Sequence, residues 1–180
     1  MSFAPPLGTT PHQQPCPGAR TGFVFICPGR FEAQRGYPCA AGTGANLARA
    51  LTVLHALAPG WFRSPDRLMY VITNSWDKVE YPALTGRSVP GVDEVLQPPN
   101  LERLAQELVS LEVVVACGAQ AHAALHALRE QGAGQLRMAE ARHLSQRSVN
   151  MIAGANDTAG RITRWCEGVL AQLSLQSRVR

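Results

Sequence analysis

The chain has a single lysine, few aromatic residues and no long apolar run. Aromatic residues make up 6% of its 180 residues, charged residues 17% and apolar residues 46%. No stretch of 18 or more apolar residues occurs, so no segment has the length of a membrane-spanning helix. We therefore expect a globular domain, neither disordered nor embedded in a membrane, and the length suits one such domain.

The cysteines show no pattern typical of disulfides or metal sites. They are odd in number, and no CxxC pair occurs among Cys16, Cys27, Cys39, Cys117 and Cys166. This spacing disfavours a disulfide framework, a zinc site and a four-cysteine cluster. We expect free thiols in a reducing cytoplasm, and neither a metal site nor another cofactor.

The start of the chain lacks the features of a signal peptide. Residues 1–20 are rich in proline, glycine and glutamine, and no basic start is followed by an apolar core. We expect a flexible N-terminal tail over residues 1–20, a single domain over residues 21–180 and a cytoplasmic location.

Arginine supplies almost all of the positive charge. Lys78 is the single lysine among 17 basic residues, the net charge is +4, and the isoelectric point is near 9.0. Either a high-GC genome or contacts with phosphate groups favours arginine over lysine. The charge is thus compatible with a nucleic-acid partner but does not require one.

A strand that ends in a glycine- and proline-rich loop is the most informative local pattern. Residues 23–27 (FVFIC) are all apolar, as in a strand covered on both faces, and Pro28 and Gly29 end it. Further glycines and prolines through residue 44 leave the backbone with few bulky side chains, so a flat ligand or a phosphate could approach it closely. The alternative is an ordinary connection between a strand and a helix.

Strands and helices alternate along the rest of the chain. The spacing of apolar residues predicts strands at 68–73, 112–117 and within 135–143, and helices at 43–57, 100–111, 119–131 and 157–175. Asn100 is the expected cap of the second helix. This order predicts an α/β fold, a three-layer α/β/α sandwich with a central, mostly parallel four-stranded sheet.

Three loops should meet at one edge of this sheet. Ligands of parallel sheets bind at the carboxyl ends of the strands. Residues 27–44, 74–90 and 143–150 each follow a predicted strand, and the segment 76–99 holds too many prolines and glycines to be regular throughout. We expect the binding site where these loops converge.

Four short motifs resemble the uracil-DNA glycosylase superfamily in order and spacing. They are CPGRFEAQRGYPCAAGTG at residues 27–44, ITN at 72–74, VVVACGAQAHAAL at 113–125 and HLSQRS at 143–148. The first looks closest to the bacterial iron-sulfur branch, and the last is similar to the HPSPLS and HPSPR loops of other branches. The cysteines of the iron-sulfur branch are missing, so we expect no cluster.

The resemblance implies a uracil-DNA glycosylase-like fold and an enzyme that flips a base out of the duplex and hydrolyses its N-glycosidic bond. It implies that Asn74 reads the base edge and that His143 stabilises the charge of the leaving base. It places Arg147 as the wedge that fills the vacated stack. The implied base-binding residues are Ile26, Cys27, Pro28, Gly29, Cys39 and Asn74, and the implied DNA-binding residues are Arg30, Ser75, Ser145 and Arg147.

The sequence departs from the superfamily pattern at two places. Many branches have an Asp or Asn at the position of Cys27 to activate water, and the iron-sulfur branch has a Glu at the position of Ile26. Glu32 in the same loop is then the first candidate for orienting water, and Asp77 is the second. The aromatic residue that stacks on uracil in much of the superfamily falls at Cys39, which suggests a wider pocket for a bulky or modified base.

We therefore expect a monofunctional DNA glycosylase that acts on a modified pyrimidine. One branch of the superfamily removes glucosylated hydroxymethylcytosine from phage DNA, and this sequence is a plausible member. A bifunctional enzyme needs an amine to form a Schiff base, and Lys78 is the single lysine. Three alternatives stay open: a uracil-DNA glycosylase of base-excision repair, a catalytically inactive DNA-binding member of the fold, and a nucleotide-binding α/β protein unrelated to DNA. DNA is the expected partner of a monomer, with no membrane and no protein partner.

Each candidate side chain also has an ordinary structural explanation. Asn74 could be a turn residue after a strand, and His143 could be a structural histidine. Glu32 could brace its loop through a salt bridge, and Arg147 could be a solvated charge.

Overall fold

A computed structural model of the chain describes residues 7–132 and 136–177. Its four strands form one parallel sheet in the order β2-β1-β3-β4. The strands are β1 (Thr21–Phe25), β2 (Val71–Asn74), β3 (Val113–Cys117) and β4 (Arg137–Ala141). The predicted α/β class and four-stranded parallel sheet are confirmed.

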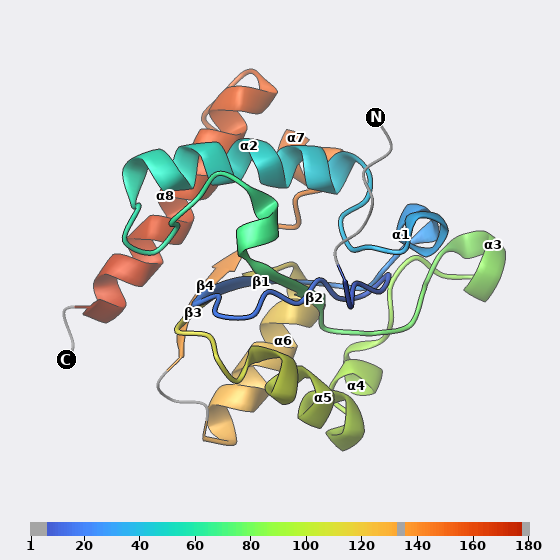
Figure 1. The fold of residues 1–180 in the computed structure, drawn as a ribbon. Coiled ribbons are helices and arrows are strands. Elements are labelled where there is room, and N and C mark those ends of the chain that lie inside the picture. The colour runs from blue at the N-terminus through green and yellow to red at the C-terminus, as the bar shows by residue number, and fades with distance from the viewer. Residues whose placement is uncertain (1–6, 133–135, 178–180) are drawn as a thin grey trace.

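Helices cover both faces of the sheet (Figure 1). They are α1 (Arg30–Arg35), α2 (Gly42–Leu57), α3 (Pro82–Thr85), α4 (Val92–Val95), α5 (Pro98–Leu108), α6 (Ala119–Glu130), α7 (Gln146–Asn150) and α8 (Thr158–Ser177), with a 3-10 turn η1 at Arg67–Met69. Figure 1 shows α2 and α8 on one face and α5 and α6 on the other, so the sheet is the middle of three layers. Within the described residues, no helix is both long and apolar enough to cross a membrane.

The central strands supply both halves of the core. Successive side chains of a strand point to opposite faces, and every residue of β1 and β3 is buried. Phe23 and Val115 pack into the cluster under α2 and α8, whereas Val24 and Val114 pack into the cluster under α5 and α6. Strands buried on both faces explain why the sequence shows continuous apolar runs rather than alternation.

The strands are offset by a few residues from their predicted bounds. Strand β1 covers Thr21–Phe25 rather than 23–27, because Thr21 already pairs with Val113 of β3. Ile26 has left the ladder, and its carbonyl accepts from the backbone N–H of Trp76 at 3.0 Å. The apolar run therefore ends in the site loop and not in the sheet.

The segments predicted as loops contain short helices. Helices α1 and α7 lie within the first and last of the three loops, α3 lies within the second, and α4 follows it within the irregular segment 76–99. Helix α5 begins at Pro98, so Asn100 is not its cap. The Asn100 amide instead donates to the carbonyls of Ser75 and Val95, at 2.7 Å each. Proline at the first helical position explains the earlier start.

Part of the segment that was expected to be a flexible tail packs against the sheet, and residues 1–6 lie outside the described part. Gln14 pairs with Ile72 at the edge of β2 and is only 1% exposed. Its side chain donates to the carbonyls of Arg67 and Tyr70, at 2.9 and 3.1 Å. Composition alone did not reveal this packing, because the segment is held by backbone pairing and by one polar side chain.

All five cysteines are free thiols, as expected. Cys39, Cys117 and Cys166 are buried, and Cys16 and Cys27 are partly buried.

Candidate functional site

A cavity of about 420 Å³ opens at the carboxyl edge of the sheet. Phe25 and Asn74, the last residues of β1 and β2, line it, and so does His143, two residues beyond β4. Its volume lies within the range of roughly 300 to 1,000 Å³ that is typical of small-molecule sites. The position is the one at which parallel sheets bind ligands.

The cavity gathers most of the residues that the sequence singled out. Nine of them line it: Ile26, Cys27, Gly29, Glu32, Cys39, Asn74, His143, Ser145 and Arg147. They come from three loops that are far apart in the sequence, so the predicted convergence of these loops is observed. Four others do not line it: Pro28, Arg30, Ser75 and Asp77.

Three of these four have other surroundings. Ser75 is fully buried, and its hydroxyl donates to the carbonyl of Ile26 at 2.9 Å, so the expected DNA contact is wrong for this residue. Pro28 is buried, and its carbonyl accepts from the backbone of Glu80 at 2.9 Å. Arg30 is exposed at the start of α1. Both Ser75 and Pro28 thus hold the loops together rather than face a ligand.

Five lining residues were missed at the sequence level: Phe25, Thr43, Ser88, Val89 and Ser148. Phe25 contacts the His143 ring edge to face, with ring centroids 5.5 Å apart and planes at 79°. No sequence signal pointed to it, because the predicted strand at 23–27 placed Phe25 in its middle, whereas β1 ends at Phe25. Ser88 and Val89 had no signal, since nothing in a long irregular loop shows which residues turn toward the sheet.

His143 is neutral and presents an N–H at this cavity. Its Nδ1 atom accepts from the backbone N–H of Ser145 at 3.0 Å, so the proton of the neutral ring sits on Nε2. Burial lowers the pKa of His143 to about 4, against the opposing effect of the Glu32 charge. Nε2 has no hydrogen-bond partner among the described residues. The ring can therefore donate a hydrogen bond to a ligand without first being charged.

Asn74 has a fixed amide orientation. Its Nδ2 donates to the backbone carbonyl of His12 at 2.9 Å, and a carbonyl can only accept. Within the described part of the chain Oδ1 has no partner, which leaves one acceptor and the second N–H of the amide for a ligand. The backbone is held as well, since Arg103 donates to the Asn74 carbonyl at 3.0 Å.

Glu32 braces its own loop through backbone N–H groups rather than through a salt bridge. Oε2 accepts from Gly29 at 3.0 Å, and Oε1 accepts from Ala40 at 2.9 Å. The carboxylate thereby joins the two ends of the loop around α1 and is held at the cavity.

The two cysteine thiols of the cavity stay protonated near neutral pH. Burial, with a further contribution from the nearby Glu80 charge, raises the pKa of Cys27 to about 12. Burial also raises the pKa of Cys39 to about 12, although Arg67 opposes the shift. Cys27 donates weakly to the Ser88 carbonyl, with 3.6 Å between sulfur and oxygen. Neither thiol can act as a base or as a thiolate nucleophile.

The turn at Cys39 has an unusual backbone. Cys39 has a φ of 52°, in the left-handed region that residues other than glycine rarely adopt. Arg67 donates to the Cys39 and Pro38 carbonyls at 2.9 and 2.6 Å. Helix α2 begins directly against this turn, and a Cβ atom at Gly44 would lie 2.0 Å from the Cys39 carbonyl oxygen. Position 44 therefore requires glycine.

An ion pair between the buried Glu80 carboxylate and the partly exposed Arg87 supports the wall formed by Ser88 and Val89. The Glu80 side chain is 3% exposed and accepts from Arg87 through Nη2 at 2.7 Å and Nε at 3.0 Å. Arg87 also binds Glu94, with Nη2 3.0 Å from Oε1. Hydrogen bonds from Arg87 lower the pKa of Glu80 to about 2 despite its burial. Arg87, the residue before Ser88, is thus held between the carboxylates of Glu80 and Glu94.

Arg147 and Ser145 lie in the loop after β4 and line the cavity. Arg147 is exposed, lines the cavity and has no side-chain partner in the described residues. The Ser145 hydroxyl accepts from the backbone of Ser148 at 3.4 Å and so caps α7. Arg147 therefore has a free guanidinium for a ligand, whereas Ser145 already has a structural contact.

No group of three or more His, Cys, Asp or Glu side chains in the described residues is arranged to hold a metal ion. No protein-family model and no curated protein matches this chain.

Proposed function

We propose that the protein is a monofunctional DNA glycosylase, with a fold like that of the uracil-DNA glycosylase superfamily. It takes a flipped pyrimidine-type base, in particular a modified or bulky one, into the cavity at the carboxyl edge and leaves an abasic site. The observation that carries the proposal is the convergence of Glu32, Asn74 and His143 on one cavity. Each belongs to a different motif that resembles this superfamily.

The geometry supports distinct roles for Asn74 and His143. Asn74 offers an acceptor and a donor in a fixed order, which suits the Watson-Crick edge of a pyrimidine. The Nε2–H of neutral His143 donates to a base oxygen, where negative charge develops as the C–N bond breaks. Removal of one such donor typically lowers the rate by roughly 10²- to 10³-fold.

Glu32 is the best candidate for orienting the water that attacks the sugar. A carboxylate has lone pairs beyond the two used by Gly29 and Ala40, so it can still accept from a water molecule. Asp77 has less support, because it does not line the cavity. In this step the water oxygen bonds to the anomeric carbon, the bonding pair of the C–N bond leaves with the base, and the proton that the water loses neutralises the departing base.

We propose a substituted base rather than uracil as the substrate. Cys39 lines the cavity where much of the superfamily has a stacking ring, and its smaller side chain would leave more room beside the base. Glucosylated hydroxymethylcytosine is the example that the resemblance supplies, and uracil in repair is the alternative. The exposed Arg30 would contact the DNA backbone, and the exposed Arg147 would fill the space that the flipped base leaves in the stack.

A second candidate function is a DNA-binding protein of this fold without catalysis. The observation that favours it is the occupation of both Glu32 oxygens by backbone N–H groups, together with Ile26 and Cys27 where other branches have a polar or acidic residue. This form would bind DNA through the same cavity and its rim but would not orient water.

Base release on two substrates tests the proposal. Purified protein is incubated with a duplex that contains uracil and with glucosylated phage DNA, and abasic sites are revealed by alkali. We expect abasic sites in at least one substrate, no strand cleavage before alkali, and a loss of about 100-fold in His143→Ala and Asn74→Ala. Arg129→Gln, an exposed change on α6 outside the cavity, should leave the rate unchanged. If the protein binds DNA but forms no abasic sites, the second candidate function is the correct one. If it neither binds DNA nor forms abasic sites, the proposal is refuted.

A further inference from the structure

A second and larger cavity, of about 940 Å³, lies at the opposite edge of the sheet. Thr21, Val113 and Arg137, the first residues of β1, β3 and β4, line it, and Tyr70 lies just before β2. It shares no lining residue with the cavity at the carboxyl edge. The proposed glycosylase reaction makes no use of it.

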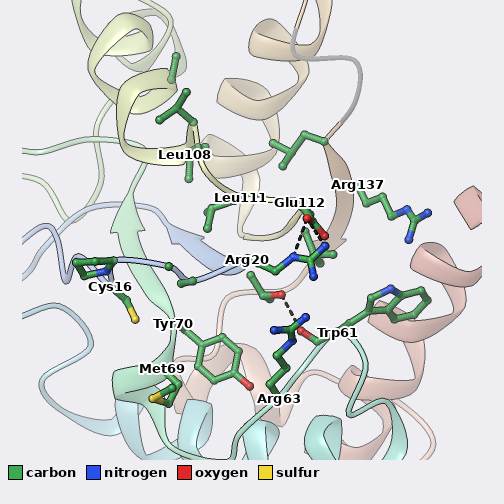
Figure 2. A pocket seen from close by; sticks show the side chains of 18 of the residues that line it. Cys16, Arg20, Trp61, Arg63, Met69, Tyr70, Leu108, Leu111, Glu112 and Arg137 are labelled. Atoms are coloured by element: carbon green, nitrogen blue, oxygen red, sulfur yellow. Dashed lines mark hydrogen bonds and ion pairs between the residues drawn. The ribbon is translucent and has the colours of Figure 1, made fainter.

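This cavity carries positive charge that the described residues leave unpaired. Three arginines and one glutamate line it, which gives a net charge of +2. Arg20 and Glu112 form an ion pair with each other. The side chains of Arg63 and Arg137 have no hydrogen-bond or ion-pair partner in the described part of the chain, although the Arg137 backbone N–H donates to the Glu112 carbonyl at 2.9 Å. Figure 2 shows their guanidinium groups around the Arg20–Glu112 pair. Unpaired guanidinium groups suit phosphate, which they can bind through two parallel N–H groups.

The cavity also has apolar surface for a flat ring. Leu108 and Leu111 are buried at its wall, whereas Met69 and Val109 are 55% and 84% exposed at its rim. Trp61 is half-buried beside the arginines (Figure 2). Its carbonyl accepts from the Thr21 hydroxyl at 2.7 Å, which fixes its loop to β1. The Trp61 indole offers a face on which a planar ring can stack.

We propose that this cavity binds a nucleoside monophosphate. The base packs on Trp61 and the apolar wall, and the phosphate lies between Arg63 and Arg137. A phosphate monoester carries a charge of about −1.5 to −2 at neutral pH, which matches the +2 of the lining. The nucleotide is either free in solution or the 5′-phosphorylated end of a strand, because both present the same chemistry.

Tryptophan fluorescence during titration with AMP detects binding. Trp76 and Trp165 are 8% and 5% exposed, and their Nε1 atoms donate to Glu80 and to the Arg142 carbonyl. A saturable change should therefore arise from Trp61 and be absent in Trp61→Phe. We expect a Kd below about 1 mM and at least about tenfold weaker binding of adenosine, which lacks the phosphate.

Matched variants place the nucleotide in this cavity. The double variant Arg63→Gln, Arg137→Gln should bind AMP at least about tenfold more weakly by calorimetry, whereas Arg129→Gln and Asn74→Ala should bind it as the native protein does. Competition by a 5′-phosphorylated oligonucleotide, but not by its 5′-hydroxyl form, would identify a strand end, and its absence would identify the free nucleotide. An absence of saturable binding overturns the proposal. So does retained affinity in the double variant combined with loss in Asn74→Ala, which would place AMP in the other cavity. AMP binding and abasic-site formation are measured separately, so either proposal can fail without the other.

Discussion

The side-chain amide of Asn74 donates from Nδ2 to the backbone carbonyl of His12, 2.9 Å away. This bond makes the N-terminal segment part of the candidate site. The segment is fixed two residues later, where Gln14 pairs with Ile72 and is buried. The orientation of the amide therefore depends on a stretch of chain that does not itself line the cavity.

Gln14→Ala should destabilise the protein and loosen Asn74. The substitution removes the side-chain donor to the carbonyls of Arg67 and Tyr70, of which the first keeps only the backbone N–H of Tyr70, and this costs about 2 kcal/mol in free energy of unfolding. Urea denaturation measures this cost. If Asn74 reads a base, the excision rate should also fall, because the His12 carbonyl no longer holds the amide in place.

Gln13→Ala is the matched control for this prediction. Gln13 is the neighbouring glutamine, and its side chain makes no hydrogen bond within the described residues, while its backbone pairs with Thr10. The change should leave both stability and excision close to native. Equal losses in the two variants would show that Gln14 has no special anchoring role.

The pKa of His143 predicts a fall in stability on mild acidification. Above pH 6.5 the ring is neutral in the folded and the unfolded chain. Between pH 6.5 and about 4, the unfolded chain takes up a proton that the folded one does not, so the free energy of unfolding falls by about 2 to 3 kcal/mol as the pH drops through this window. NMR titration of the ring should give a midpoint near 4. His143→Gln should lack this part of the pH dependence, and an ordinary midpoint near 6.5 would contradict the buried neutral ring.

Glu32→Gln separates bracing from catalysis. An amide can still accept from one backbone N–H, but its NH₂ group would face the other. The free energy of unfolding should therefore fall by about 1 to 2 kcal/mol.

 If Glu32 also orients water, kcat should fall further than stability alone explains, with KM little changed. If it only braces the loop, excision by the folded variant should stay within a few-fold of native, as steady-state kinetics below the melting temperature would show.

Much of the site could be predicted because it lies where strands end. Asn74 follows an apolar run that is recognisable as a strand, His143 lies at the end of the segment 135–143 that was expected to contain the last strand, and parallel strands bring their carboxyl ends to one edge. Ser75 was misplaced because sequence does not show which side of the chain a residue faces after a strand ends. Its hydroxyl turns inward to the Ile26 carbonyl.

Other parts of the site depend on contacts between distant segments, which no local pattern reveals. Ser88 and Val89 reach the cavity because the preceding Arg87 is clamped by Glu80 and Glu94. The packing of Gln14 depends likewise on carbonyls more than 50 residues further along the chain. In both cases a single polar side chain sets the path of a long irregular segment.

Arg87→Met should displace the wall formed by Ser88 and Val89. The change leaves Glu80 buried without its partner, which raises the pKa of this carboxyl and lowers the melting temperature by several degrees. Adding Glu80→Gln should restore much of the thermal stability, because no uncompensated charge is then buried. Calorimetric melting of the single and double variants checks this. Equal melting temperatures in Arg87→Met and the native protein would show that the ion pair does not hold the loop.

Two glycines at the start of α2 offer a matched pair of substitutions. At Gly44 a Cβ atom would lie 2.0 Å from the Cys39 carbonyl oxygen, and backbone cannot move aside as a side chain can. At Gly42, two residues earlier in the same helix, a Cβ atom would meet nothing within 4 Å. Gly44→Ala should therefore cost about 3 kcal/mol in free energy of unfolding. Gly42→Ala should be neutral or stabilising by about 0.5 kcal/mol, because alanine restricts the unfolded chain and favours the helix.

The same pair tests whether the Cys39 turn shapes the cavity. Cys39 and Thr43 both line it, so a shift of the turn away from position 44 changes the space open to a ligand. Gly44→Ala should then reduce excision even at temperatures where the variant is folded, whereas Gly42→Ala should not. Chemical denaturation followed by kinetics on the folded fraction distinguishes the two effects. A Gly44→Ala protein with native stability would show that the contact between α2 and the Cys39 carbonyl is not as close as the structure has it.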